Sequence, residues 1–365
     1  MKKIAFICRD LKGWGWIVSQ KMILDLLSEW NLVDLYCPEK PNIRHDNFHF
    51  KKIPVLGSFF ATKEPFFVVY TFFLFFKIVT LYDKFILPHR HGIINFLKNK
   101  EIITIFHTTH FWQSLGHAKA LSYYRYMKIR VIFFHICTCV LHWFFSVFDL
   151  LNIALSQAIF FVSSQEKNYF SKIGFSEKKL FNLPLLYYST LPTVITKKTI
   201  EMKKDTYQFL YIWRLDPWKW IDVLCELLKE HCQYLGSFLG SFTLNIVGQW
   251  PLEASITEYS FVRYFGQLER EELSYFYKHS HIMLMPSFYE TGPLVTLEAL
   301  RNNLPVLSTA VGSFCIELPY PEYQISELSH FYNKIPLILK HRESIVQSNS
   351  DFLKDVENRT SFISL

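Results

Sequence analysis

Short apolar runs alternate with longer stretches of helical periodicity along the chain, and this alternation limits the possible folds more than any other sequence feature. The apolar runs, rich in Ile, Val and Phe, predict strands at residues 3–8, 32–37, 48–55, 84–88, 102–106, 158–163, 208–213, 243–247, 262–265, 281–285 and 305–308. The stretches between them predict helices at residues 17–30, 65–82, 119–155, 219–232, 269–279 and 293–302. Strands that alternate with helices pair in parallel and are covered on both faces. The sequence therefore predicts an α/β protein.

The domain organisation follows from the length of the chain and from a break near its middle. At 365 residues the chain exceeds the usual size of one hydrophobic core. Residues 187–206 lack periodicity and collect Thr and Lys. We expect an N-terminal Rossmann-like domain at 1–190, a C-terminal one at 191–345, and a helix or tail at 346–365 that returns to the first. Two doubly wound domains would hold a ligand in the cleft between them, at the carboxyl ends of the strands.

Charge is distributed unevenly between the two halves. Residues 1–190 carry 23 Lys and Arg against 12 Asp and Glu, a net charge of +11, whereas residues 191–365 carry 16 against 20, a net charge of −4. A basic half favours a polyanionic partner. Nucleic acid is one candidate, but the basic residues are interleaved with long apolar runs and form no compact cluster or known module. An anionic membrane surface fits this mixture better.

Two apolar segments bear on the same question. Residues 65–76 are uninterrupted apolar, and residues 131–148 span 18 positions without a full charge, which just reaches the length of a membrane-spanning helix. Both lie between strands of one predicted domain, which a span would separate. A buried helix and a helix in the membrane interface remain the two alternatives, with Arg125, Lys128 and Arg130 placed to meet lipid phosphates. We expect peripheral attachment to the cytoplasmic face of a membrane.

The seven cysteines form no Cys-x-x-Cys pair. They predict small buried side chains in a reducing compartment.

The most informative stretch for chemistry is HIMLMPSFYETGPLVTLEALRNNLPVLSTAVG, residues 281–312. A strand ends at Pro286-Ser287, a loop carries Glu290, and Pro293 suits the first position of a helix that contains Glu298. The free N–H groups at the start of that helix favour an anion, and carboxylates accept hydrogen bonds from hydroxyl groups. This pattern indicates a site for an anion and a polyol. The alternative is that Glu290 caps the helix and Glu298 lies on its solvated face.

The same stretch resembles the retaining glycosyltransferases of family 4, also called group 1. Their C-terminal domains carry Pro-Ser-x-x-Glu, a nearby glycine, a second Glu and a Pro-Val strand, here Pro286-Ser287-Phe288-Tyr289-Glu290, Gly292, Glu298 and Pro305-Val306. The resemblance implies the GT-B fold, in which two Rossmann-like domains face each other across a cleft. It also implies that Glu290, with Thr291 and the backbone at Gly292, Pro293 and Leu294, contacts the transferred sugar, and that Glu298 holds the ribose.

Upstream, FLYIWRLDPWKWIDVLCELL at residues 209–228 is similar to the family's strand, Gly-Arg-Leu, Lys-Gly and helix. The resemblance makes Arg214 and Lys219 a clamp for the diphosphate, whose negative charge grows as the glycosidic bond breaks. Trp213 and Trp220 stand where the family usually has glycines. This departure leaves open whether the backbone follows the family's path at these positions.

Looser matches supply the remaining candidates. RYFGQLEREELSYFY at residues 263–277 resembles the segment that flanks the nucleobase, which would place the backbone of Gly266 and Gln267 there. Gly15 follows the first strand, where the family has a glycine-rich loop near the donor phosphates. His107 ends another strand and matches a histidine of the family's cleft, although a histidine that only satisfies hydrogen bonds at a strand end is an equal alternative.

The chain has no Asp-x-Asp, no His-Glu-x-x-His and no P-loop. We therefore expect no metal and no cofactor, with a nucleotide diphosphate sugar as co-substrate.

The resemblance implies a retaining, metal-independent glycosyltransferase, and the membrane-facing half favours a glycan or lipid-linked acceptor, as in bacterial lipopolysaccharide synthesis. Two alternatives stay open: a nucleotide-sugar epimerase on the same fold, and a non-catalytic scaffold that has lost donor binding, for which the two tryptophans are the main argument.

Overall fold

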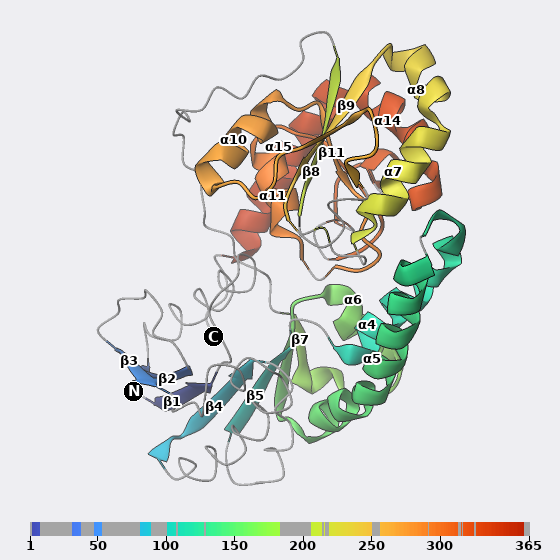
Figure 1. Cartoon of the computed structure of the whole chain (residues 1–365). Helices are drawn as coiled ribbons and strands as arrows, with labels where there is room; N and C mark the ends of the chain where they lie inside the picture. Colours follow the sequence, from blue (N-terminus) through green and yellow to red (C-terminus); the bar gives the residue numbers. More distant parts are fainter. Residues whose placement is uncertain are drawn as a thin grey trace. The chain divides into compact units, whose positions relative to one another are not determined.

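The computed structural model contains two compact units built on parallel sheets (Figure 1). The first unit comprises residues up to 113 together with 141–182, and the second comprises 114–140 together with 206–360. The structure describes residues 2–7, 31–37, 47–52, 81–88, 101–106, 109–127, 129–182, 206–213, 215, 219–249, 256–290, 292–312, 315, 317–324 and 326–360. The predicted helix at 17–30 lies outside these residues, and so does the predicted helix at 65–82 except for residues 81 and 82.

The first unit contains a seven-stranded sheet with the order β3-β2-β1-β4-β5-β6-β7, all parallel. Its strands are β1 (Lys3–Ile7), β2 (Leu32–Cys37), β3 (Phe48–Lys52), β4 (Lys84–Pro88), β5 (Glu101–Phe106), β6 (Ala158–Phe161) and β7 (Leu180–Asn182). The chain between and after these strands forms the helices α4 (His110–Ala120), η3 (Leu121–Tyr126), α5 (Ile129–Leu155), α6 (Ser164–Lys172) and η4 (Glu177–Lys179), of which the stretch 114–140 belongs to the second unit. The order of the strands reverses between β1 and β4, as in Rossmann folds.

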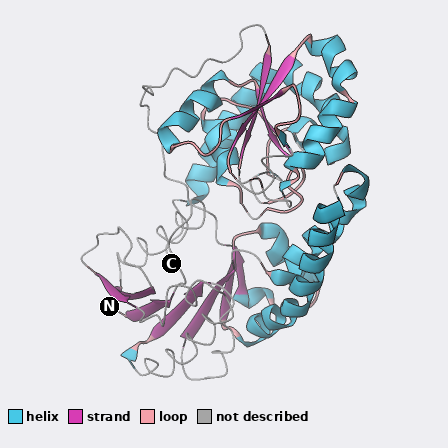
Figure 2. Ribbon diagram, viewed as in Figure 1, coloured by secondary structure: helices cyan, strands magenta, loops and turns pink. Residues whose placement is uncertain are grey.

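The second unit repeats the scheme with a five-stranded parallel sheet, β10-β9-β8-β11-β12. Its strands are β8 (Tyr207–Ile212), β9 (Phe242–Val247), β10 (Val262–Tyr264), β11 (Ile282–Met285) and β12 (Val306–Ser308). The central strands β9 and β11 are buried along their whole length, because helices cover both faces of the sheet (Figure 2).

Figure 1 shows which helices cover each face of this sheet. On one face lie α7 (Ile221–Glu230), α8 (Cys232–Leu239) and α14 (Phe331–Lys340). On the other lie α10 (Arg270–His279), α11 (Leu294–Arg301) and α15 (Arg342–Thr360). Two short helices, α13 (Pro321–Gln324) and η6 (Leu328–His330), complete the unit.

Within the described residues, each predicted strand is present, with small shifts at the ends. The α/β class with two Rossmann-like sheets is thereby confirmed.

The predicted single helix at 119–155 is wrong in one respect. The backbone becomes extended at Met127, with φ −109° and ψ 141°, and this residue separates η3 from α5. Residues 114–140, which we call the helical arm, pack into the core of the second unit through Ala120, Met127 and Val131. The domain boundaries drawn from the sequence stay a prediction.

The cysteine prediction is correct only in part. The six described cysteines are free thiols, and Cys37, Cys225 and Cys315 are buried, but Cys137 and Cys232 are exposed.

Candidate functional site

The second unit brings two candidate residues together at the carboxyl edge of its sheet. The order of its strands reverses between β8 and β11, which pair in register at Phe209 and Ile282. Lys219 lies in the segment after β8, and Glu290 in the loop after β11. Loops that leave neighbouring parallel strands at such a reversal are where α/β proteins bind ligands.

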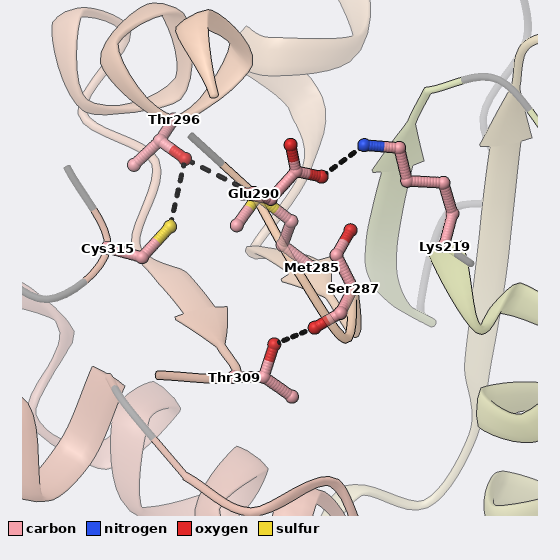
Figure 3. A network of polar contacts seen from close by, with 7 residues as sticks. All are labelled: Lys219, Met285, Ser287, Glu290, Thr296, Thr309 and Cys315. Carbon is pink, nitrogen blue, oxygen red and sulfur yellow. Dashed lines mark hydrogen bonds and ion pairs between the residues drawn. The ribbon is translucent and has the colours of Figure 1, made fainter. Parts of the chain in front are cut away.

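The Lys219 ammonium forms an ion pair with the Glu290 carboxylate, and both side chains are buried (Figure 3). The Lys219 Nζ also lies 4.3 Å from the centre of the Trp213 ring, a favourable cation–π distance. Buried charges are costly to keep unless they are paired. The Glu290 carboxylate therefore pairs with Lys219 and does not cap the helix, contrary to the alternative drawn from the sequence.

Trp220 retains the backbone conformation that a glycine would adopt. Its φ is 52° and its ψ is 27°, in the left-handed region that favours glycine. Its indole is buried between the rings of Tyr123 and Phe288, at centroid distances of 4.6 and 5.6 Å. The turn between Lys219 and α7 therefore contains a non-glycine residue with an unfavourable φ. The packing of the indole offsets the free-energy cost of this conformation.

The loop that carries Glu290 is held from the side of β12. The Thr309 hydroxyl donates a hydrogen bond to the Ser287 carbonyl (Figure 3). Gly312 has φ 73°, and a Cβ at this position would lie 2.8 Å from the Glu290 Cβ. Only a glycine satisfies both the backbone angle and the close approach.

Helix α11 begins one residue later than predicted. Pro293 is the residue before the helix, with φ −69° and ψ 108°, and Leu294 is the first helical residue. Gly292 and Pro293 therefore precede the helix and Leu294 begins it, and all three lie within four residues of Glu290 in the chain. The N–H groups of a first helical turn have no intrahelical partner and are suited to an anion.

Glu298 lies inside α11 and is buried, so it does not occupy a solvated helix face. Its Oε2 accepts a hydrogen bond of 2.7 Å from the Tyr277 hydroxyl. The sequence analysis did not identify Tyr277. The available signal was a tyrosine on the buried face of the predicted helix at 269–279, where its hydroxyl needs a polar partner.

Gly266 and Gln267 lie beyond the end of β10, two strands away from β8 on the same edge of the sheet. Gly266 has φ 69°, and its carbonyl accepts a hydrogen bond of 2.8 Å from the Gly248 N–H. Gln267 is exposed. The remaining candidates, Gly15, His107, Arg214 and Thr291, lie outside the described residues.

The site contains one buried thiol, which is unsuited to nucleophilic chemistry. Burial raises the pKa of Cys315 to about 12, and its Sγ lies 3.6 Å from the Thr296 hydroxyl (Figure 3). A thiol with such a pKa is protonated at neutral pH. Among the described residues, no group of three or more His, Cys, Asp or Glu could hold a metal ion. The described polar groups are a cation, two carboxylates and a helix N-terminus, which suit binding of an anion that also carries hydroxyl groups.

Comparisons with known proteins bear on the family and the fold. Residues 195–317 match the family model described as glycosyl transferases group 1. An uncharacterized 41.2 kDa protein in the cps region of Klebsiella pneumoniae is 28% identical over 114 residues, which span 31% of this chain and 30% of that protein. The match thus covers less than a third of either protein.

Solved structures resemble the chain over nearly its full length. Sucrose-phosphate synthase from Thermosynechococcus elongatus has a TM-score of 0.65 at 17% identity and covers 98% of this chain and 95% of its own. WaaG, a glycosyltransferase involved in lipopolysaccharide biosynthesis, has a TM-score of 0.67 at 13% identity, with 99% of both chains covered. Anabaena HepE, solved in complex with UDP-glucose, has a TM-score of 0.63 at 13% identity, with 98% and 95% covered.

At these identities the structural similarity shows the fold alone, which is GT-B with two Rossmann-like domains. The matched segment contains the Lys219–Glu290 pair, Glu298 and the start of α11. The resemblance inferred from the sequence motifs is therefore confirmed as a match: residues 195–317 match the group 1 glycosyl transferase model, and the fold of the chain is GT-B.

Proposed function

We propose that this protein is a retaining, metal-independent glycosyltransferase that takes a sugar from a nucleotide diphosphate sugar bound by its second unit. The observation that carries the proposal is the buried Lys219–Glu290 pair at the strand-order reversal, inside the segment that matches the family. An ion pair buried at a ligand-binding edge is easier to explain by a ligand than by stability, because buried pairs contribute little net stability.

In the proposed reaction, the acceptor hydroxyl attacks the anomeric carbon on the face that the diphosphate leaves. The bond from the anomeric carbon to the diphosphate oxygen breaks, the bond to the acceptor oxygen forms, and a diphosphate oxygen takes the acceptor proton. Lys219 and the start of α11 stabilise the negative charge on the leaving diphosphate, together with Arg214. Glu290 accepts hydrogen bonds from the sugar, and Glu298 accepts them from the ribose. His107 belongs to the sugar or phosphate side of the same site.

The test is a thermal-shift panel of UDP, GDP, ADP and CMP with their common sugar conjugates. A ligand at about 100 times its dissociation constant stabilises the fold by about 2.7 kcal/mol, a shift of several degrees. HepE was solved with UDP-glucose, which makes the uridine pair the first to measure. We expect one nucleoside diphosphate and its conjugate to give the largest shift.

Variants of two lysines separate a site from a general charge effect. Lys219→Met removes the buried cation, and Lys229→Met removes an exposed lysine from the neighbouring helix, paired with Glu226 at 3.5 Å. Because Lys219→Met alone leaves the Glu290 charge buried without its partner, the double variant Lys219→Met/Glu290→Gln serves as a second test. We expect affinity to fall by about 10- to 100-fold in the Lys219 variants and to stay unchanged in Lys229→Met.

Other outcomes would favour the alternatives. A wild-type protein that no nucleotide stabilises would support the non-catalytic scaffold. Rapid release of free sugar and nucleotide without any acceptor would support the epimerase.

We further propose that the acceptor is a glycan or lipid-linked molecule of the cell envelope, and that α5 attaches the protein to the membrane that presents it. In the described part of the chain, one helix stretch, Ile129–Leu151, is long and apolar enough to span a membrane. We define its exposed stripe as the large apolar side chains on one side of α5: Ile129, Phe133, Ile136, Val140, Trp143, Phe144, Val147 and Leu151. Their spacing of three or four residues places them on one helix face.

The opposite side of α5 packs against protein, which favours a helix lying in the interface over a span. Val131, His135, Asp149 and Ile153 are buried there. Asp149, the single acidic residue of α5, accepts a 3.2 Å hydrogen bond from the Phe111 N–H. Arg130, near the start of the helix, is exposed and can contact anionic headgroups. The exposed stripe thus combines apolar area, an aromatic anchor and a neighbouring cation without an exposed acid on the helix.

A further inference from the structure

The loop that carries Glu290 also packs against the helical arm. Phe288 and Tyr289, the two residues before Glu290, pack against α4 and α5, and Phe288 is 2% exposed. Any shift of these two rings moves the carboxylate that follows them. The arm therefore controls the position of a residue in the proposed donor site.

Gly116 in α4 allows the closest approach between the arm and the loop. A Cβ at this position would lie 2.8 Å from the Phe288 Cε2 and 2.8 Å from the Tyr289 Cδ1. Real Cβ atoms do not come this close to ring carbons, so any larger residue would push the rings outward. Glycine is unfavourable in the middle of a helix, and the close packing accounts for its presence here.

Two histidines of the arm, His117 and His135, also contact the loop that carries Glu290. The Nδ1 atoms of His117 and His135 lie 2.8 Å apart, which joins α4 to α5 by a hydrogen bond. Both rings contact Phe288, with centroids 5.1 and 5.3 Å from its own. Both side chains are buried.

The pair requires that one Nδ1 carry a hydrogen and the other accept it. The Nε2 of His135 is buried without a hydrogen-bond partner. Burial lowers the pKa of His135 to about 4, which keeps this ring neutral at physiological pH. The contact beneath Phe288 is thus a directional hydrogen bond in which His135 takes part as a neutral ring.

We propose that Gly116, His117 and His135 are positioning residues for the donor sugar. Their contacts fix the position of the Phe288 and Tyr289 rings, and this in turn fixes the position of the Glu290 carboxylate. This inference rests on the proposed function. It gives the helical arm a role in sugar recognition, whereas the domain boundaries predicted from the sequence assign these residues to the N-terminal domain at 1–190. A shift of the two rings displaces Glu290 directly and reaches Lys219 through the Lys219–Glu290 ion pair and the packing of Phe288 on Trp220, so the sugar contact should be affected more than the nucleotide contact.

The test compares two helical glycines. Gly116→Ala introduces the Cβ beneath the rings, and Gly236→Ala introduces one in α8, where nothing lies within 4 Å. Alanine normally stabilises a helix relative to glycine, so Gly236→Ala should raise the melting temperature and change no affinity. Affinities for UDP and UDP-glucose, or for the pair that the panel selects, are measured by titration calorimetry on the full chain.

We expect Gly116→Ala to keep most of its affinity for the nucleoside diphosphate and to lose affinity for the sugar conjugate by about 10-fold or more, since small displacements of a positioning group are costly. Equal losses for both ligands would point to general damage and would overturn the proposal, as would unchanged affinities for both. A wild-type protein that binds neither ligand would contradict the proposed function itself, before the variants are compared.

The histidine pair is tested by a conservative rescue. His135→Leu removes the hydrogen bond to His117, whereas His135→Asn keeps an amide that can donate or accept a hydrogen bond near the position of the histidine Nδ1. We expect the ratio of the two affinities to be disturbed in His135→Leu and largely restored in His135→Asn. Equal ratios in the two variants would contradict a role for the hydrogen bond.

Discussion

Trp220 shows how a large residue can occupy a backbone conformation that favours glycine. The resemblance expects glycine at this position, and the structure has a tryptophan with φ 52°. A left-handed conformation costs a non-glycine residue about 1–2 kcal/mol. Burial of the indole against Tyr123 and Phe288 offsets that cost.

The balance predicts an unusual order of stabilities at position 220. Trp220→Ala loses the buried indole and retains the unfavourable φ, whereas Trp220→Gly loses the indole and gains a backbone suited to the turn. Removing a buried tryptophan costs about 3–5 kcal/mol. We expect Trp220→Gly to be less destabilised than Trp220→Ala by about 1 kcal/mol, measured by urea denaturation. The reverse order would show that the turn at 220 is not strained.

At the scale of elements, the His117–His135 hydrogen bond joins α4 to α5 inside the arm. Because His135 is buried there, the free energy of unfolding depends on pH. Burial holds the pKa of His135 near 4, against about 6.5 in an unfolded chain. Below pH 6.5 the unfolded chain therefore binds a proton that the folded chain does not. The contribution of His135 to the free energy of unfolding is complete above pH 6.5 and falls as the pH drops toward 4. Below pH 4 both states bind the proton, and the contribution changes no further.

We expect the free energy of unfolding to fall by up to about 3 kcal/mol from this group between pH 6.5 and 4. The measurement is urea denaturation at several pH values within this window, for the wild type and for His135→Asn, which has no group that titrates there. The difference between the two pH profiles isolates His135, since burial also lowers the pKa of His281 and this residue is present in both proteins. Parallel profiles would contradict the assignment.

At the scale of the whole molecule, the uneven charge and the exposed stripe of α5 lead to one prediction about membranes. The wild type should sediment with vesicles that contain phosphatidylglycerol and bind weakly to phosphatidylcholine vesicles, because residues 1–190 carry a net charge of +11. Added salt should weaken binding, since it screens the headgroup attraction.

The variant for this test is Phe133→Ser/Trp143→Ser, which removes two side chains of the exposed stripe that are each 67% exposed. We expect it to lose most of its vesicle binding while keeping its nucleotide affinity. The matched control is Phe238→Ser, a 61% exposed phenylalanine of α8 outside the stripe. Vesicle binding that survives in the double variant would contradict the proposed attachment. Conversion of a dimeric wild type to a monomer by the same substitutions would assign the stripe to a second copy of the chain.

The sequence by itself determined the alternation of strands and helices, and with it the parallel sheets, because apolar periodicity is a local property. It also indicated that Lys219 and Glu290 lie at the same edge of one sheet, since each follows a strand and the repeated βα pattern predicts that these strands are parallel. Only the tertiary structure decided what holds these residues. The contact of Gly116 with Phe288 joins positions far apart in the chain, and the His117–His135 bond depends on how α4 packs on α5.

Two further features of the structure could not be predicted from local sequence patterns for the same reason. The partner of Glu298 is Tyr277 on a different helix, and the break at Met127 accompanies its burial in the core of the second unit. Periodicity reports which face of an element is apolar, but it carries no information about which other element covers that face or how closely. Distances between segments remote in sequence are set by packing, and packing exists only in the folded chain.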